Sequence, residues 1–135
     1  MPVKRKQKAS PAIGVRKADV ALGILKPIFA KIGWSPIIGC DLNFSTFTTS
    51  KDYIALWMKW DDAFVANDPA PVYANYKHDG VLDRESYRRD SSEWNARRQQ
   101  WFNDQLNVIL PELKSVCSKN GWRFRTAGTQ IRINP

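Results

Sequence analysis

The last sixteen residues of the chain, NGWRFRTAGTQIRINP, alternate between apolar and polar side chains on both sides of an Ala-Gly pair. Alternation with a period of two is typical of a β-strand, and two such runs that meet at a glycine predict a β-hairpin. With Ala127 and Gly128 as the turn, Phe124 lies opposite Ile131 on one face, while the other face carries three arginines. The predicted pairs on the arginine face are Arg123 with Arg132 and Arg125 with Gln130.

Two arginines directly opposite each other in a hairpin repel, at a cost of a few tenths to about 1 kcal/mol. Carboxylates from a neighbouring helix can relieve this repulsion, and so can the phosphates of a ligand. Arginine forms planar two-bond contacts with either group, so the hairpin alone leaves both alternatives open. Arg123, Arg125 and Arg132 are therefore predicted phosphate contacts, with internal ion pairing as the alternative.

The first half of the chain changes from helical to strand periodicity. Residues 20–34 carry an apolar stripe that predicts a helix, with Asp19 as its N-cap and a kink or break at Pro27. Residues 37–47 alternate and predict a half-buried strand. The helical stripe consists of Leu22, Leu25, Ile28, Phe29 and Ile32.

Residues 51–67 predict a second helix, capped by Ser50, because their large apolar side chains recur at helical spacing. The two tryptophans of this stripe are expected in the core. A turn-rich stretch follows, with a short edge strand predicted at residues 72–75. The second stripe consists of Tyr53, Leu56, Trp57, Trp60 and Phe64.

Residues 83–118 predict a long helical region that restarts at Ser91 or Ser92, bends at Pro111 and stops at the Asn-Gly pair 120–121. The order of elements predicts an α+β fold in which helices pack on one face of a small antiparallel sheet that ends in the C-terminal hairpin. A chain of 135 residues is expected to form a single small domain.

The net charge of +8 is concentrated at the two ends of the chain. Residues 1–17 carry six basic and no acidic side chains, residues 119–135 carry four and none, and the middle has a balance of −2. Residues 1–17 are therefore predicted to be a flexible basic arm, with the single domain at 18–135. The arm either contacts a polyanion or only keeps the protein in solution. Its expected nucleic-acid contacts are Lys4, Arg5, Lys6 and Lys8.

A row of large side chains spaced by seven follows the long predicted helix, beside several arginines. Aromatic side chains among cations are typical of surfaces that bind single-stranded nucleic acid. The alternative is a helix that packs on its own core, with the arginines paired to Glu85, Asp90, Glu93 and Asp104. The row consists of Tyr87, Trp94, Trp101 and Val108, and the arginines beside it are Arg88, Arg97 and Arg98.

The stretch IIGCDLNFS, residues 37–45, locally resembles the first strand of the RuvC-type nucleases of the RNase H-like fold. The resemblance implies Asp41 as the first metal ligand of a two-metal nuclease. It covers nine residues, after which that family continues into further strands while this sequence enters the helix predicted from Ser50. The second carboxylates considered, which lack a matching context, are Asp61, Asp62 and Glu85.

Other catalytic or metal-binding patterns are not evident. His78 and Asp79 are adjacent, an arrangement in which a carboxylate seldom orients a histidine, and they are assigned to a turn. Cys40 and Cys117 lack the spacing of zinc ligands and are expected to be buried thiols in a reducing compartment. The sequence also lacks a phosphate-binding glycine loop, so no cofactor or metal is predicted.

These features together predict a small, basic, non-enzymatic protein that binds nucleic acid, DNA or RNA, mainly through the phosphate backbone. The alternative is a protein-interaction module, such as an inhibitor, adaptor or assembly component, that docks an acidic partner protein. A metal-dependent nuclease is the minor alternative. Because neither a membrane helix nor a signal peptide is evident, an intracellular location is expected, cytoplasmic or associated with nucleic acid. The predicted contact residues are Lys4, Arg5, Lys6, Lys8, Arg88, Trp94, Arg97, Arg98, Arg123, Arg125 and Arg132.

Overall fold

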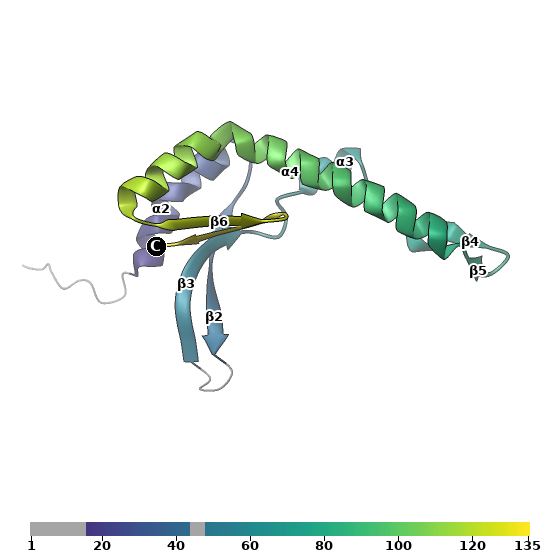
Figure 1. Cartoon of the computed structure of the whole chain (residues 1–135), viewed down its shortest axis with the longest axis horizontal. Coiled ribbons are helices and arrows are strands. Elements are labelled where there is room, and N and C mark those ends of the chain that lie inside the picture. Colours follow the sequence, from purple (N-terminus) through teal and green to yellow (C-terminus); the bar gives the residue numbers. More distant parts are fainter. Residues whose placement is uncertain (1–15, 44–47) are drawn as a thin grey trace, which may run out of the picture.

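The computed structural model describes residues 16–43 and 48–135 of the chain (Figure 1). The predicted arm contacts Lys4, Arg5, Lys6 and Lys8 lie outside the described residues. The elements in chain order are α2 (Lys17–Ala30), β2 (Pro36–Asn43), β3 (Thr48–Leu56), α3 (Asp62–Asn67), the 3₁₀ helix η2 (Tyr73–Tyr76), β4 (Lys77–His78), β5 (Val81–Leu82), α4 (Arg84–Asn120), β6 (Arg123–Ala127) and β7 (Gln130–Asn134).

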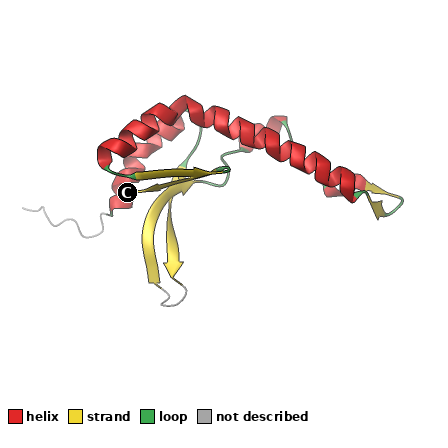
Figure 2. Cartoon of the chain, in the orientation of Figure 1, coloured by secondary structure: helices red, strands yellow, loops and turns green. Residues whose placement is uncertain are grey.

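The predicted α+β fold is confirmed. Four antiparallel strands form the main sheet in the order β2-β3-β7-β6, and the chain ends in the hairpin β6–β7. Helices α2 and α4 lie against one side of these strands (Figure 2). In the centre of the sheet Ile54 of β3 lies opposite Ile133 of β7, and both are buried in the core that the helices complete. The helices contribute Leu25, Phe29, Phe102, Ile109 and Leu113 to this core.

The helix predicted over residues 51–67 is wrong for its first part. Residues Thr48–Leu56 form strand β3, which pairs with β2 on one side and with β7 on the other, so Ser50 is a strand residue and no N-cap. The most buried side chain of the segment, that of Ile54, is absent from the predicted helical stripe. Pairing with a strand 79 residues further along the chain decided the conformation, and local spacing did not show it.

Two smaller predictions of local structure are also corrected. The segment predicted as an edge strand at 72–75 forms the 3₁₀ helix η2. Helix α2 begins at Lys17, so Asp19 is its third residue and accepts a hydrogen bond from the backbone N–H of the N-cap residue Arg16 at 3.3 Å. This is the reciprocal half of a capping box. Pro27 lies inside α2 and does not divide it.

Helix α4 is one continuous helix, so the predicted restart at Ser91 or Ser92 is wrong. Asp83 caps its start by accepting a hydrogen bond from the N–H of Ser86 at 3.1 Å, and Gly121, with φ 72°, ends it as predicted. Figure 1 shows that α4 is bent and that its first half extends away from the sheet. Pro111 lies inside α4 and lacks the N–H of the helical hydrogen bond, which accounts for the predicted bend.

The C-terminal hairpin has the predicted faces but a different turn. Gly128 has φ 59° and occupies the first position of a two-residue turn with Thr129, so Arg125 pairs with Arg132 and Arg123 with Asn134. A residue other than glycine at that first position would be strained, which explains why Ala127 stays in the strand. The pairing differs from the prediction by two residues, and an even shift leaves every side chain on its face.

None of the helices in residues 16–43 and 48–135 is both long enough and apolar enough to cross a membrane.

Candidate nucleic-acid interface

The sheet face away from the helices carries the three arginines of the hairpin. Ile131 and Ile133 point into the core, so Arg132 between them and its pairing partner Arg125 point to the other side of the sheet. Arg123 shares that side and, like Arg125, is exposed, whereas Arg132 is half-buried. The structure thus confirms the arginine face and places two like charges directly opposite each other.

Arg132 contacts the aromatic ring of Tyr53, which lies in the segment for which the sequence predicted a helix. Its guanidinium carbon lies 3.8 Å from the ring centroid of Tyr53, within the range of a cation–π interaction. The same ring lies across Gly39 on the neighbouring strand, where an added Cβ would stand 2.7 Å from two ring carbons. A glycine inside a strand often marks such a close approach, so Gly39 is the feature of the sequence that could have indicated the contact with Tyr53.

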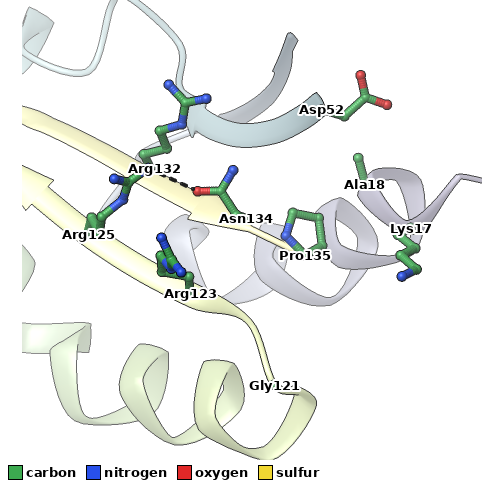
Figure 3. Close-up of a pocket in the computed structure, with 9 residues that line it drawn as sticks. All are labelled: Lys17, Ala18, Asp52, Gly121, Arg123, Arg125, Arg132, Asn134 and Pro135. Carbon is green, nitrogen blue, oxygen red and sulfur yellow. Dashed lines mark hydrogen bonds between the residues drawn. The ribbon is translucent and has the colours of Figure 1, made fainter. Parts of the chain in front are cut away.

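An open hollow of about 700 Å³ lies where the arginine face meets the beginning of α2. Figure 3 shows Arg123, Arg125 and Arg132 on the two hairpin strands, and Lys17 at the start of α2 across from them. Among the lining residues that the structure describes, Asp52 is the one acidic side chain, and it forms an ion pair with Arg16 at 3.2 Å. We refer to this hollow as the cationic hollow because four of its described lining residues are basic.

Bridging of the arginines by helix carboxylates, one of the two predicted alternatives, is not seen for the two exposed arginines. Over the described part of the chain, neither Arg123 nor Arg125 forms an ion pair with a carboxylate. Arg125 instead donates a hydrogen bond of 3.4 Å from Nη2 to the neutral side-chain oxygen of Asn134. The neutral partner leaves the charge of Arg125 uncompensated.

The arginines predicted on the long helix have acidic partners within the chain. Nε and Nη2 of Arg97 donate to the two carboxylate oxygens of Asp68 at 2.7 and 3.1 Å, and the indole N–H of Trp94 donates to the backbone oxygen of Asp68 at 2.7 Å. The Arg97 guanidinium lowers the pKa of Asp68 below its usual value. These contacts attach the segment after α3 to α4.

Arg98 is more enclosed than Arg97. It donates to Asp61 at 2.8 Å, and its guanidinium carbon lies 4.5 Å from the ring centroid of Trp60 and 5.7 Å from that of Trp94. Arg88 is exposed and has no ion pair among the residues that the structure describes. The predicted internal partners of this row were Glu85, Asp90, Glu93 and Asp104, whereas those observed are Asp68 and Asp61.

The two tryptophans of the predicted row are half-buried and pack against other aromatic side chains, Trp101 at the edge of the core and Trp94 outside it. Trp101 packs on Trp60 with ring centroids 6.3 Å apart, and both contact the buried Trp34. Trp94 packs on Phe64 at 5.8 Å. Val108, the last member of the predicted row, is 68% exposed, because a seven-residue interval drifts around a helix of 3.6 residues per turn.

The residues considered for catalysis do not assemble into a site in the described part of the chain. Asp41 lies in β2, but the position of its side chain is outside what the structure describes. No group of three or more His, Cys, Asp and Glu side chains that could hold a metal ion occurs among the described residues. His78 is exposed in β4.

The two thiols differ. Cys117 is buried as expected, and burial raises the pKa of its thiol. Cys40 is exposed, so the expectation of two buried thiols is wrong for it.

No protein-family model, curated protein or solved structure matches the chain. The class of protein must therefore be argued from this surface alone.

Proposed function

We propose that this protein binds nucleic acid through the phosphate backbone, with the arginine face of the sheet as its contact surface and without catalysing a reaction. The observation that carries the proposal is the cationic hollow lined by Lys17, Arg123, Arg125 and Arg132, in which Asp52, the one acidic side chain among the described lining residues, is already paired with Arg16. Phosphates that lie there would give the exposed guanidinium groups of Arg123 and Arg125 anionic partners.

The compensated arginines set the extent of this surface. Arg97 and Arg98 already form ion pairs with Asp68 and Asp61, so we expect them to contribute little to nucleic-acid binding. Arg88, which is exposed, and the basic arm remain proposed auxiliary contacts. Backbone contacts carry little sequence information, so DNA and RNA of any sequence are the proposed ligands, and the proposed location is cytoplasmic or associated with nucleic acid.

The proposal is tested by the double substitution Arg123→Gln and Arg125→Gln, which keeps the strand alternation and removes two exposed charges. Affinity for oligonucleotides should fall equally for all sequences. The slope of log K against log salt, measured between about 50 and 200 mM, should flatten by about 1.8 units for duplex DNA and about 1.4 units for a single strand.

The matched control is the double substitution Lys26→Gln and Lys114→Gln, which removes the same charge from exposed positions on α2 and α4. It should leave the salt slope close to that of the original protein. An equal effect of the two double substitutions would reduce the binding to unspecific attraction by net charge, and the absence of salt-dependent binding in the original protein would refute the proposal.

A further inference from the structure

A second hollow, of about 380 Å³, opens on the same face of the sheet, toward the turn of the hairpin. Its lining includes Tyr53, Met58, Trp60 and Gln130. Arg132 borders both this hollow and the cationic one. The two hollows are thus neighbours that share one guanidinium group.

The two hollows differ in the chemistry of their walls. The first is lined mainly by basic residues, whereas the second is lined mainly by aromatic and apolar residues together with Gln130 and Arg132. Gln130 and Asn134, which line the second and the first hollow, are four residues apart on β7, which corresponds to about 13 Å along a strand. A ligand that matches both hollows carries an anionic group beside an apolar group.

Building on the proposed function, we infer that the second hollow takes a nucleobase and that the ligand is therefore single-stranded nucleic acid. A duplex keeps its bases stacked and shows only their edges in the grooves, whereas a single strand can place a base face against a protein. Aromatic side chains and arginine guanidinium groups are the surfaces on which such bases stack. Met58 and Trp60 form the apolar side of the hollow, and Arg132 separates base from phosphate.

Charge favours a nucleotide strand as the occupant. Among the described residues, four basic side chains line the cationic hollow, and Asp52 is paired with Arg16. In a nucleotide strand each phosphate is followed by a base, which is the alternation that the two hollows present. An acidic protein segment with apolar side chains shares part of this chemistry, so it is included as an arm of the experiment.

The decisive comparison uses oligonucleotides of equal length that differ only in their bases. A single strand with bases and an abasic strand carry the same phosphates, so both should bind to the cationic hollow. Base stacking should make the strand with bases bind about tenfold more tightly or better at the same salt concentration. The duplex and polyglutamate complete the set of probes, and the duplex should bind more weakly than the single strand with bases.

The substitution Met58→Ala tests whether the second hollow causes the difference in affinity between the strand with bases and the abasic strand. Met58 is 73% exposed, so its truncation should not disturb the core, but it should reduce the advantage of the strand with bases about threefold or more and leave the abasic strand unaffected. Val108→Ala is the matched control, because Val108 is 68% exposed on α4, away from both hollows. It should change neither affinity.

The outcomes separate the inference from the proposed function. Equal binding of the abasic strand and the strand with bases, with a normal salt slope, overturns the inference alone. A difference that Met58→Ala leaves intact also overturns it, because the base then lies elsewhere. Failure of every nucleic acid to bind overturns the proposed function, and tight binding of polyglutamate in that case points to an acidic protein partner.

Discussion

Gly39, Tyr53 and Arg132 form a stack across three strands, in which the missing side chain of Gly39 leaves room for the Tyr53 ring and the ring supports the Arg132 guanidinium. The ring of Tyr53 lies over Gly39, and the Arg132 guanidinium lies over the ring. The arrangement holds a cationic side chain in place on an otherwise open face.

Gly39→Ala should destabilise the protein by about 1–3 kcal/mol, because the added Cβ would stand 2.7 Å from the Tyr53 ring and force it to move. In a Tyr53→Ala background the same change should be neutral or stabilising, since alanine is better than glycine inside a strand by about 0.5–1 kcal/mol. Urea unfolding of the four proteins measures both effects. Equal costs in both backgrounds would contradict the stack.

Ion pairs in this protein should differ in strength with their exposure. The side chains of Arg98 and Asp61 are 25% and 15% exposed, whereas those of Lys31 and Glu112 are 56% and 44% exposed. Asp61→Asn leaves an enclosed guanidinium without its carboxylate and should cost about 1–3 kcal/mol of unfolding free energy. Glu112→Gln, the matched control, should cost less than about 1 kcal/mol. Equal costs in denaturant melts would show that Arg98 is solvated after all.

The two halves of helix α4 contact different parts of the molecule. The buried side chains of α4 all lie from Phe102 onward, where the helix covers the sheet. Its first half instead contacts the segment from Asp61 to Tyr76, through aromatic packing and through polar contacts that include the hydrogen bond of 2.7 Å from the Tyr76 hydroxyl to Asp90 of α4. Carboxylates therefore contribute to stability at this end.

Acidification should loosen this end first. Arg97 lowers the pKa of Asp68, Ser86 lowers that of Asp83 and Tyr76 lowers that of Asp90. A carboxyl with a lowered pKa in the folded state stabilises fully above its unfolded pKa of about 3.9, and this contribution disappears as the pH falls through the folded value.

Hydrogen exchange should accordingly show lost protection in the first half of α4 as the pH falls below about 4, before the sheet is affected. Asp68→Asn should reduce protection already at neutral pH and weaken the acid dependence. Uniform loss of protection over sheet and helix would argue against a local effect of these carboxylates.

Sequence reasoning predicted those elements whose conformation is determined by their own residues. The two faces of the hairpin follow from alternation, and the end of α4 follows from the Asn-Gly pair 120–121. It failed for β3, because Tyr53, Trp57 and Trp60 fall at helical spacing by coincidence, and only the pairing of Ile54 with Ile133 reveals the strand. The arginines of the candidate site were thus predictable.

Three partners in the site were missed for the same reason. Lys17, Asp52 and Tyr53 reach the arginine face through contacts between segments distant in the sequence.

At the scale of the whole molecule, charge lies both on the described sheet and in the first residues of the chain. Deleting residues 1–13 should barely change the melting temperature, because this segment has few apolar side chains to bury. Affinity for nucleic acid should fall, and the salt slope should flatten, because Lys4, Arg5, Lys6 and Lys8 are lost. A decrease in melting temperature of about 10 °C or more would show that the segment packs on the domain.

The strand order β2-β3-β7-β6 also governs how the molecule assembles. The hairpins β2–β3 and β6–β7 can each form from neighbouring residues, but joining them requires closure of the long loop between Ile54 and Ile133. Until β7 arrives, β3 has an unpaired edge that can recruit a strand from another molecule. Folding and aggregation therefore compete for the same hydrogen bonds, and crowded nascent chains would be the most vulnerable.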